Sequence, residues 1–385
     1  MKRITTIYII SFIIIIIMIV FAVKFIPNYV YSKNIKTKIK NSPNKTMQNI
    51  TIPKNTKKPI SEPNSELIEY NGVIRHIFFH CLIAFPENNG SKSLEADCVT
   101  VSEFKNCLTE LYKNDYILVN INNTFEIVNQ NGVKIARQKK VKIPKGKKPL
   151  VLSVDDVVYD SKKKGLGMVD KLILDENGEI ATSTIKSDGT KEISKNNEIF
   201  PILNNFVETH PDFSNDCAKG TLALTGWEGI LGYRISSNYP KSVTNNELKH
   251  LKPIIQKLKD TGWTFACHSY GHSHPSKISD SYFSTTEIGQ WKKEIESVVG
   301  HTNIYVYPYG ETILQNSPKY KLLIDNGFMV MCGVSQIQEW QNFGNTLYMS
   351  RYSIDGTTLS TQRNNLMDLF DSNKVYDVKV RNTLR

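Results

Sequence analysis

Short apolar strands alternate with amphipathic helices along most of the chain, and this alternation restricts the fold more than any other feature. The first unit has an apolar strand at Val73–His80, a helix that opens with the capping box Thr100-x-x-Glu103, and a strand at Tyr116–Asn120. Such a β-α-β rhythm predicts a parallel sheet, closed or open, covered by helices.

The same rhythm continues to residue 332. Further strands are expected at 150–154, 221–226, 263–267, 304–307 and 328–332, with helices at 204–208, 247–260, 287–299 and 318–326. Between 160 and 200 the rhythm is interrupted by two hairpin-like pieces that turn near Gly178 and Gly189, which predicts an inserted β-hairpin region. Residues 67–385 are therefore expected to form one α/β domain that carries an insertion.

The N-terminal end predicts a membrane segment. Lys2 and Arg3 precede an almost purely apolar run from Ile4 to Val23, which is long enough to cross a bilayer as a helix. Because no good cleavage site follows, residues 1–23 are expected to be an uncleaved anchor rather than a signal peptide. Residues 24–66 are rich in Lys, Asn and Pro and predict an extended stalk. We expect a single-pass protein with its main domain outside the cell, secreted if the segment is cleaved.

Composition excludes several classes of function. The net charge is +11, but the lysines concentrate in 24–58 and 134–148 without any nucleic-acid-binding motif, so these segments are expected to be solvated and no nucleic-acid partner is predicted. Nothing predicts a protein partner either. The six cysteines show no C-x-x-C pairing, which excludes a zinc ribbon and favours buried apolar positions for most of them.

Residues able to perform chemistry gather where the predicted strands end. Asp155 and Asp156 end one strand, His268 and His272 follow another, and Tyr309 follows a third. In barrels of parallel strands, these carboxyl ends meet at one face, where catalysis occurs. The imidazoles of His268 and His272, together with the carboxylate of Asp156, would make a catalytic metal site with positions left for water and substrate. Zinc is the default metal, with cobalt, iron or manganese conceivable, and Asp155 is placed to act as a base.

Each of these residues also has a plainer interpretation. His268 and His272 can be polar loop residues, and His274 is expected to be one. Arg351 can line the site or form a structural ion pair, and Trp340 can be a sugar-stacking wall or part of the core.

Three motifs resemble those of the polysaccharide deacetylase family with the NodB-type domain, carbohydrate esterase family four. SVDDV at Ser153–Val157 resembles the first motif, T-F-D-D-G, and HSYGH at His268–His272 matches H-S/T-x-x-H at every defined position. YPYG at Tyr307–Gly310 resembles the third motif, R-x-P-Y-G. The resemblance covers most of residues 67–360 and implies a distorted (β/α)7 barrel.

The resemblance also implies roles for particular residues. Asp155 would be the general base, Asp156, His268 and His272 the metal ligands, and the Tyr309 backbone N–H a donor to the oxyanion. The implied reaction is hydrolysis of an N-acetyl group, or less often an O-acetyl group, from a surface polysaccharide.

The chain departs from the family pattern at three places. Val157 replaces a glycine, Val306 stands where the third motif has an arginine that orients the base, and no histidine occurs after His301 to supply the usual acid. In the branch that resembles poly-N-acetylglucosamine deacetylases, the motif order is permuted and this histidine ends an early strand. His80 lies in that context, so we expect His80 to be the general acid.

The resulting hypothesis is a membrane-tethered, metal-dependent deacetylase of a glycan of the cell envelope that contains N-acetylglucosamine, such as peptidoglycan. An alternative is a non-catalytic glycan-binding or structural protein that retains the barrel, which the changes at Val157 and Val306 favour. A third possibility is an intracellular deacetylase of small molecules, which would require the apolar run at 4–23 to have another meaning.

Overall fold

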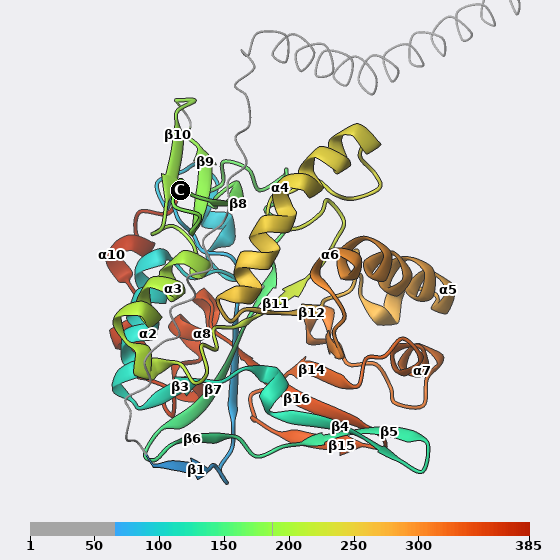
Figure 1. Cartoon of the computed structure of the whole chain (residues 1–385). Helices are drawn as coiled ribbons and strands as arrows, with labels where there is room; N and C mark the ends of the chain where they lie inside the picture. The colour runs from blue at the N-terminus through green and yellow to red at the C-terminus, as the bar shows by residue number, and fades with distance from the viewer. Residues whose placement is uncertain (1–65, 187) are drawn as a thin grey trace, which may run out of the picture. The chain divides into compact units, whose positions relative to one another are not determined.

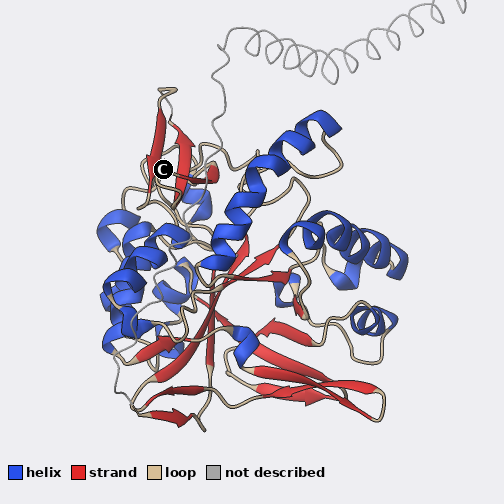
Figure 2. Ribbon diagram, viewed as in Figure 1, coloured by secondary structure: helices blue, strands red, loops and turns tan. Residues whose placement is uncertain are grey.

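The computed structural model describes residues 66–385 except Ser187 (Figures 1 and 2). The predicted anchor at 1–23 and nearly all of the predicted stalk at 24–66 lie outside the described residues. Within the part of the chain that is described, no helix combines the length and the apolar character needed to cross a membrane.

Seven parallel strands form a closed barrel. Their order around the barrel is β11 (Thr221–Leu224), β12 (Thr264–Cys267), β13 (Ile304–Val306), β14 (Val330–Val334), β16 (Thr346–Ser353), β2 (Arg75–Phe79) and β7 (Lys148–Asp156), and β7 pairs with β11 to close the ring. This confirms the (β/α)7 barrel expected from the motifs, with one barrel strand, β16, that the apolar pattern did not predict.

Strand β7 distorts the barrel because it serves three neighbours. It pairs with β2 through its middle residues, with β3 (Tyr116–Leu118) through Lys148–Leu150, and with β11 through Ser153–Asp156. The first half of β7 therefore lies beside β3, and only its second half closes the barrel. The carboxyl end of β7, which carries the two aspartates, faces the barrel mouth.

The helices are α2 (Val101–Lys113), α3 (Ile199–Thr209), α4 (Lys241–Asp260), α5 (Asp280–Tyr282), α6 (Ser297–Val299), α7 (Pro318–Asp325), α8 (Gly356–Thr361), α9 (Ser372–Val375) and α10 (Val378–Arg381). The capping box predicted at Thr100 is present, since Thr100 accepts from the Glu103 N–H and Glu103 accepts from the Thr100 N–H. The helix expected at 287–299 differs from the prediction. Two π-helical stretches, Phe283–Gln290 and Lys292–Glu296, lie between α5 and α6.

Smaller antiparallel sheets surround the barrel. The insertion forms β8 (Lys171–Leu174), β9 (Ile180–Ile185) and β10 (Lys191–Ser194), paired in two successive hairpins as the turns at Gly178 and Gly189 indicated. The other pairs are β1 (Leu67–Glu69) with β6 (Lys142–Pro144), β4 (Phe125–Gln130) with β5 (Val133–Gln138), and β15 (Trp340–Phe343) with β16.

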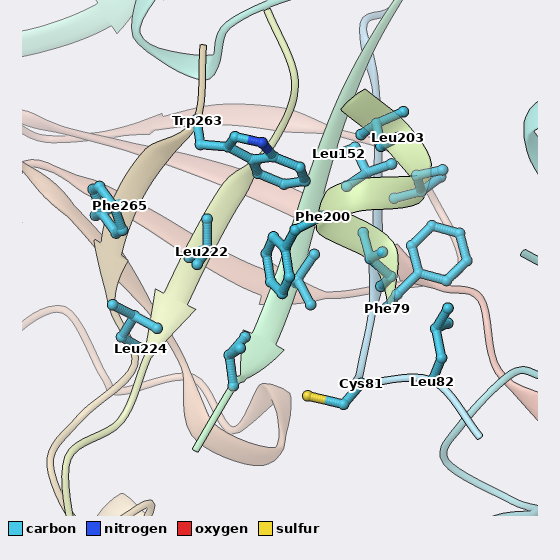
Figure 3. Packing of buried hydrophobic residues seen from close by; sticks show 14 of the residues in the cluster. Phe79, Cys81, Leu82, Leu152, Phe200, Leu203, Leu222, Leu224, Trp263 and Phe265 are labelled. Carbon is cyan, nitrogen blue, oxygen red and sulfur yellow. The ribbon is translucent and has the colours of Figure 1, made fainter. Parts of the chain in front are cut away.

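The barrel wall separates two hydrophobic clusters. Successive residues of a strand point to opposite faces. One cluster joins Leu152, Leu222 and Phe265 of the wall to Phe200 and Leu203 of α3, with the ring of Phe200 4.9 Å from that of Trp263 (Figure 3). Neighbours of these wall residues, Val151, Ala223 and Ala266, belong to the second cluster on the other side of the wall. All six cysteines are unpaired and five are buried, as their sequence context suggested.

Candidate active site

The parallel register brings the predicted site residues together at the carboxyl ends of the strands. In the pairing of β7 and β12 with β11, both Asp156 and Cys267 lie opposite Leu224. His268 follows directly, and its N–H donates to the Leu224 carbonyl at 3.0 Å. His272 lies in the next loop. Residues more than a hundred positions apart in the chain thus meet at one end of the barrel.

Asp156, His268 and His272 form a compact ligand cluster. Their ligating atoms all lie within 4.8 Å of one another. Asp156 Oδ1 is 3.7 Å from His272 Nε2 and 3.9 Å from His268 Nε2, which is too long for hydrogen bonds. Zinc holds such atoms at about 2 Å, so ligands of one ion lie roughly 3–4 Å apart. The spacing therefore suits atoms arranged around one cation.

Three further observations show that these residues fit a divalent cation. Asp156 Oδ1 is buried and has no hydrogen-bond partner among the described residues. His268 Nδ1 lies 3.0 Å from the Val306 carbonyl, which can only accept, so Nδ1 carries the proton and Nε2 is left for the cluster. Burial and the neighbouring His268 lower the pKa of His272 to about 4, which keeps its imidazole neutral near pH 7.

Asp155, the neighbour of Asp156, is bound by an arginine instead. Arg351 donates to both carboxylate oxygens of Asp155, at 2.7 and 2.9 Å, and both side chains are buried. Burial alone would raise the pKa of Asp155, but the charge and the hydrogen bonds of Arg351 outweigh it and lower the pKa to about 2. Asp155 is therefore ionised and fixed in orientation.

This pair corrects one concern that the sequence raised. Val306, where the third family motif has an arginine, lies on β13, whereas Arg351 approaches Asp155 from β16. The arginine that orients the carboxylate is thus present but comes from another strand. Of the two interpretations of Arg351, lining the site or forming an ion pair, both hold.

Two buried residues behind Arg351 were missed in the sequence. Arg351 Nη1 donates to Ser153 Oγ at 3.2 Å, and Ser153 Oγ lies 3.1 Å from His76 Nε2. Because arginine can only donate, the Ser153 hydroxyl is left to donate to His76. Burial lowers the pKa of His76 well below its ordinary value, so its ring is neutral and can accept this bond. No local signal distinguishes His76 within an otherwise apolar strand.

Tyr309 and His274 form an aromatic pair at the edge of the cluster. The Tyr309 ring stacks on His274, with centroids 3.8 Å apart, and its other neighbour is His272 at 4.3 Å. His274 Nδ1 lies 2.9 Å from Glu311 Oε2. His274 is therefore a loop residue, as expected, and it supports Tyr309 without joining the ligand cluster.

His80 lies directly after β2, at the same end of the barrel. Its Nδ1 is 3.1 Å from the Asp97 carbonyl, so Nδ1 carries a proton and Nε2 remains for another partner. The charge of His80 makes a minor contribution to the lowered pKa of Asp155 and of His272, beside burial and nearer groups. His80 is thus close enough to act on the site electrostatically.

Backbone strain concentrates at this site. The residues with left-handed φ include Asp156 (71°), Val157 (22°), Ser269 (65°), His272 (54°) and Tyr309 (58°). Such conformations cost free energy in residues other than glycine and often mark functional positions. Val157 adopts a left-handed conformation although it is β-branched and its side chain is fully buried. The turn that replaces the expected glycine is therefore packed differently.

Trp340 is half-buried against the second hydrophobic cluster, the one that contains Val151, Ala223 and Ala266. This favours its interpretation as part of the core.

Comparison with known families agrees with this site. Residues 219–329, less than a third of the chain, match the family model described as polysaccharide deacetylase. The matched stretch contains His268, His272 and the YPYG motif, whereas Asp155 and Asp156 lie outside it. No curated protein matches the chain.

Solved structures give distant likenesses. A deacetylase of Streptococcus pyogenes in complex with acetate is 13% identical, with 78% of this chain and 98% of that chain covered and a TM-score of 0.45. A de-N-acetylase from Aggregatibacter actinomycetemcomitans is 12% identical, with 78% and 100% covered and a TM-score of 0.45. IcaB from Ammonifex degensii is 9% identical, with 74% and 93% covered and a TM-score of 0.39.

Residues 219–329 match the polysaccharide deacetylase family, and this match supports a carbohydrate deacetylase, a hydrolase, as the class of the enzyme. The family resemblance and the enzyme class predicted from the motifs are therefore confirmed.

Proposed function

We propose that the protein is a metal-dependent enzyme that removes N-acetyl groups from a glycan of the cell envelope containing N-acetylglucosamine. The observation that carries this proposal is the division of labour at the barrel mouth. Three residues direct their ligand atoms at one another, while a fourth, Asp155, is held separately by Arg351. A pure binding module has little use for a base beside three ligands.

Asp156, His268 and His272 would hold the metal, for which zinc is the default and cobalt, iron and manganese also fit nitrogen and oxygen donors. A divalent cation bound there polarises the acetyl carbonyl and increases the acidity of a bound water. The neutral imidazole of His272, the Nε2 atom of His268 and the buried, unpaired oxygen of Asp156 are the donors suited to this ion.

Asp155 would take the proton from the attacking water. The two hydrogen bonds from Arg351 keep its carboxylate ionised and aimed into the site, so it can accept a proton without first rearranging. This role is supported by the distance of 3.7 Å between Asp155 Oδ2 and His268 Nε2.

His80 would supply the acid that protonates the departing amine. The Asp97 carbonyl holds Nδ1–H, which leaves Nε2 as the nitrogen that can carry the transferable proton. The Tyr309 backbone N–H would donate to the oxyanion of the tetrahedral intermediate, and the left-handed φ of 58° determines where this amide points.

The proposed location follows from the N-terminal sequence. An apolar run from Ile4 to Val23 would anchor the enzyme, and the Lys/Asn/Pro-rich residues 24–66 would separate the catalytic domain from the bilayer. A domain tethered in this way outside the cytoplasm would reach envelope glycans. The family match supports a polysaccharide as the substrate.

The test uses the full chain, purified in detergent. We expect acetate release from oligomers of N-acetylglucosamine or from peptidoglycan, loss of this activity after chelation, and recovery on adding zinc. Asp155→Asn should lower the rate by roughly 10²–10⁴-fold, the usual contribution of a general base. No acetate from any glycan, with glycan binding retained, would favour the non-catalytic glycan-binding alternative. Release that continues unchanged in Asp155→Asn would remove Asp155 from the mechanism.

A further inference from the structure

A buried carboxylate holds the loop that joins the two histidine ligands. Glu287 is fully buried and accepts three hydrogen bonds from this loop. The donors are the Ser269 hydroxyl, the Gly271 N–H at 2.8 Å and the Ser273 hydroxyl at 2.6 Å. All three bonds join the Glu287 carboxylate to residues between His268 and the position just after His272.

Glu287 comes from an unusual helical segment. It lies in the π-helical stretch Phe283–Gln290. π-Helical turns are rare in proteins, and those that occur are often found at functional sites. The helix continues through Trp291 into the second π-helical stretch, Lys292–Glu296. In this continuation, Glu294 accepts from the Tyr270 hydroxyl at 2.6 Å, and Trp291 Nε1 donates to the Leu224 carbonyl at 2.7 Å. The segment therefore contacts both the ligand loop and β11, the strand opposite Asp156.

The conformation of the loop requires such support. Ser269 and His272 have φ values of 65° and 54°, which cost free energy unless surrounding contacts stabilise them. A Cβ added to Gly271 would lie 2.9 Å from Glu287 Oε1, closer than real contacts allow. The loop therefore fits against the carboxylate without spare room.

We propose that Glu287 is the positioning residue of the metal site, setting the direction of His268 and His272 through the loop between them. It touches neither ring and would act through Ser269, Gly271 and Ser273. This inference rests on the proposed function, because it takes the ligand cluster to be a metal site. It assigns the π-helical segment a role in metal affinity.

The experiment compares full-chain protein carrying Glu287→Gln or Gly271→Ala with the unmutated chain. Zinc alone is titrated in competition with a chromophoric chelator, and the absorption spectrum of the Co²⁺-loaded protein reports the coordination geometry. In Glu287→Gln, the amide NH₂ group is itself a donor and cannot accept from all three donors of the loop. In Gly271→Ala, the added methyl group displaces the Glu287 carboxylate. Both variants should weaken zinc binding by roughly 10–100-fold, the usual effect of a residue that orients a ligand, and should alter the Co²⁺ bands.

Glu103→Gln is the matched control. Glu103 is also a fully buried carboxylate on a helix, but it accepts from Arg381 and from the Thr100 N–H, away from the ligand loop. This variant should lower thermal stability and leave zinc affinity unchanged. If Glu287→Gln and Gly271→Ala also leave zinc affinity unchanged, the proposal is wrong.

A second measurement separates this inference from the metal dependence itself. If the unmutated chain binds neither zinc nor cobalt, the proposed metal site fails, and hydrogen exchange at the Gly271 amide then tests the loop. Protection of this amide that is lost in Glu287→Gln would support positioning by Glu287. Equal exchange in both proteins would overturn it.

Discussion

Asp155 and Asp156 are adjacent in sequence but lie in opposite environments. Asp155 is almost fully buried, and both of its carboxylate oxygens receive hydrogen bonds from Arg351. Asp156 is partly exposed, has a left-handed backbone, and keeps a buried oxygen without a partner among the described residues. Both carboxylates approach His268 Nε2, at 3.7 and 3.9 Å, but Arg351 binds only Asp155, whereas Asp156 Oδ1 also lies 3.7 Å from His272 Nε2.

The difference shows which half of the site the protein completes by itself. The Asp155 half is a buried ion pair with good geometry, which holds its shape whether or not anything else binds. In the ligand half, Asp156, His268 and His272 direct electronegative atoms at one another, an arrangement that a cation would stabilise. Substitutions in the two halves should therefore have different consequences, beginning with those expected to be largest.

Removing a ligand should greatly weaken metal binding and preserve the fold. If the roughly 10–16 kcal/mol measured for four-ligand zinc sites is shared evenly, His272→Ala should weaken zinc affinity by about a hundred- to a thousand-fold. Thermal unfolding of the metal-free variant should match that of the unmutated protein, because His272 is half-buried and its backbone is strained. Competition titration and calorimetry check this pair of results. Unchanged zinc affinity would contradict the assignment.

Removing the arginine should have the opposite signature. Arg351→Met leaves Asp155 buried without its cation, a change that costs about 3–5 kcal/mol in typical buried pairs. Zinc affinity should change far less than in His272→Ala, since Arg351 contacts none of the three ligands. Denaturant unfolding measures the loss in the free energy of unfolding. The control is Arg137→Met, which removes an exposed ion pair with Glu126 and should change the stability little. Equal stabilities of the two variants would contradict the division.

The pH dependence of stability provides a second test of the ion pair between Asp155 and Arg351. The pKa of Asp155 is about 2, below the value near 3.9 of an unfolded aspartate, so the unfolded state binds the proton first. This stabilisation, about 2 kcal/mol, is present above pH 4 and is lost as the pH falls towards 2. In Arg351→Met, burial would instead raise the pKa of Asp155 above its unfolded value, so the sign would reverse and the variant would lose stability as the pH rises above about 4. Unfolding curves between pH 2 and 5 compare the two proteins.

His80 belongs to neither half and tests whether the acid is separate. His80→Gln removes the transferable proton while a side chain that can hydrogen-bond remains, so the rate of acetate release should fall by roughly 10²-fold at unchanged zinc affinity. The control is His250→Gln, which replaces an exposed histidine on α4 and should keep full activity. A His80→Gln variant that keeps most of the rate would leave the acid unassigned.

Local patterns in the sequence were sufficient to predict most of the barrel. Apolar runs bounded by turns located six of the seven barrel strands, and the capping box located the start of α2, because these signals depend on neighbouring residues. β16 was missed because TLYMSRYS is not a continuous apolar run and contains an arginine, which is buried only through its pairing with Asp155. The anchor and the stalk remain predictions.

The site was predictable where its residues share a motif. The ligand cluster and Asp155 were predicted from two short stretches, and the structure brings all four residues together. Of the supporting residues, Arg351 was named from the sequence but without its partner, and His76 and Glu287 were not predicted, because all three act through contacts with residues far from them in sequence. Spacing along one chain segment carries no information about such contacts.

The smallest predicted effect concerns the hydrogen bonds behind Arg351. Ser153→Ala removes the hydroxyl that accepts from Arg351 and donates to His76, leaving His76 Nε2 buried without a donor. The free energy of unfolding should fall by about 1–2 kcal/mol, the cost of one unsatisfied buried group. Because the two bonds from Arg351 to Asp155 remain, the rate of acetate release should fall only a few-fold.

Ser153→Thr, which keeps the hydroxyl, is the matched comparison and should restore most of the stability and the rate. If Ser153→Ala instead costs as much activity as Arg351→Met, then Ser153 orients the arginine. The Asp155 half would in that case depend on a longer chain of contacts, which reaches β2 through His76.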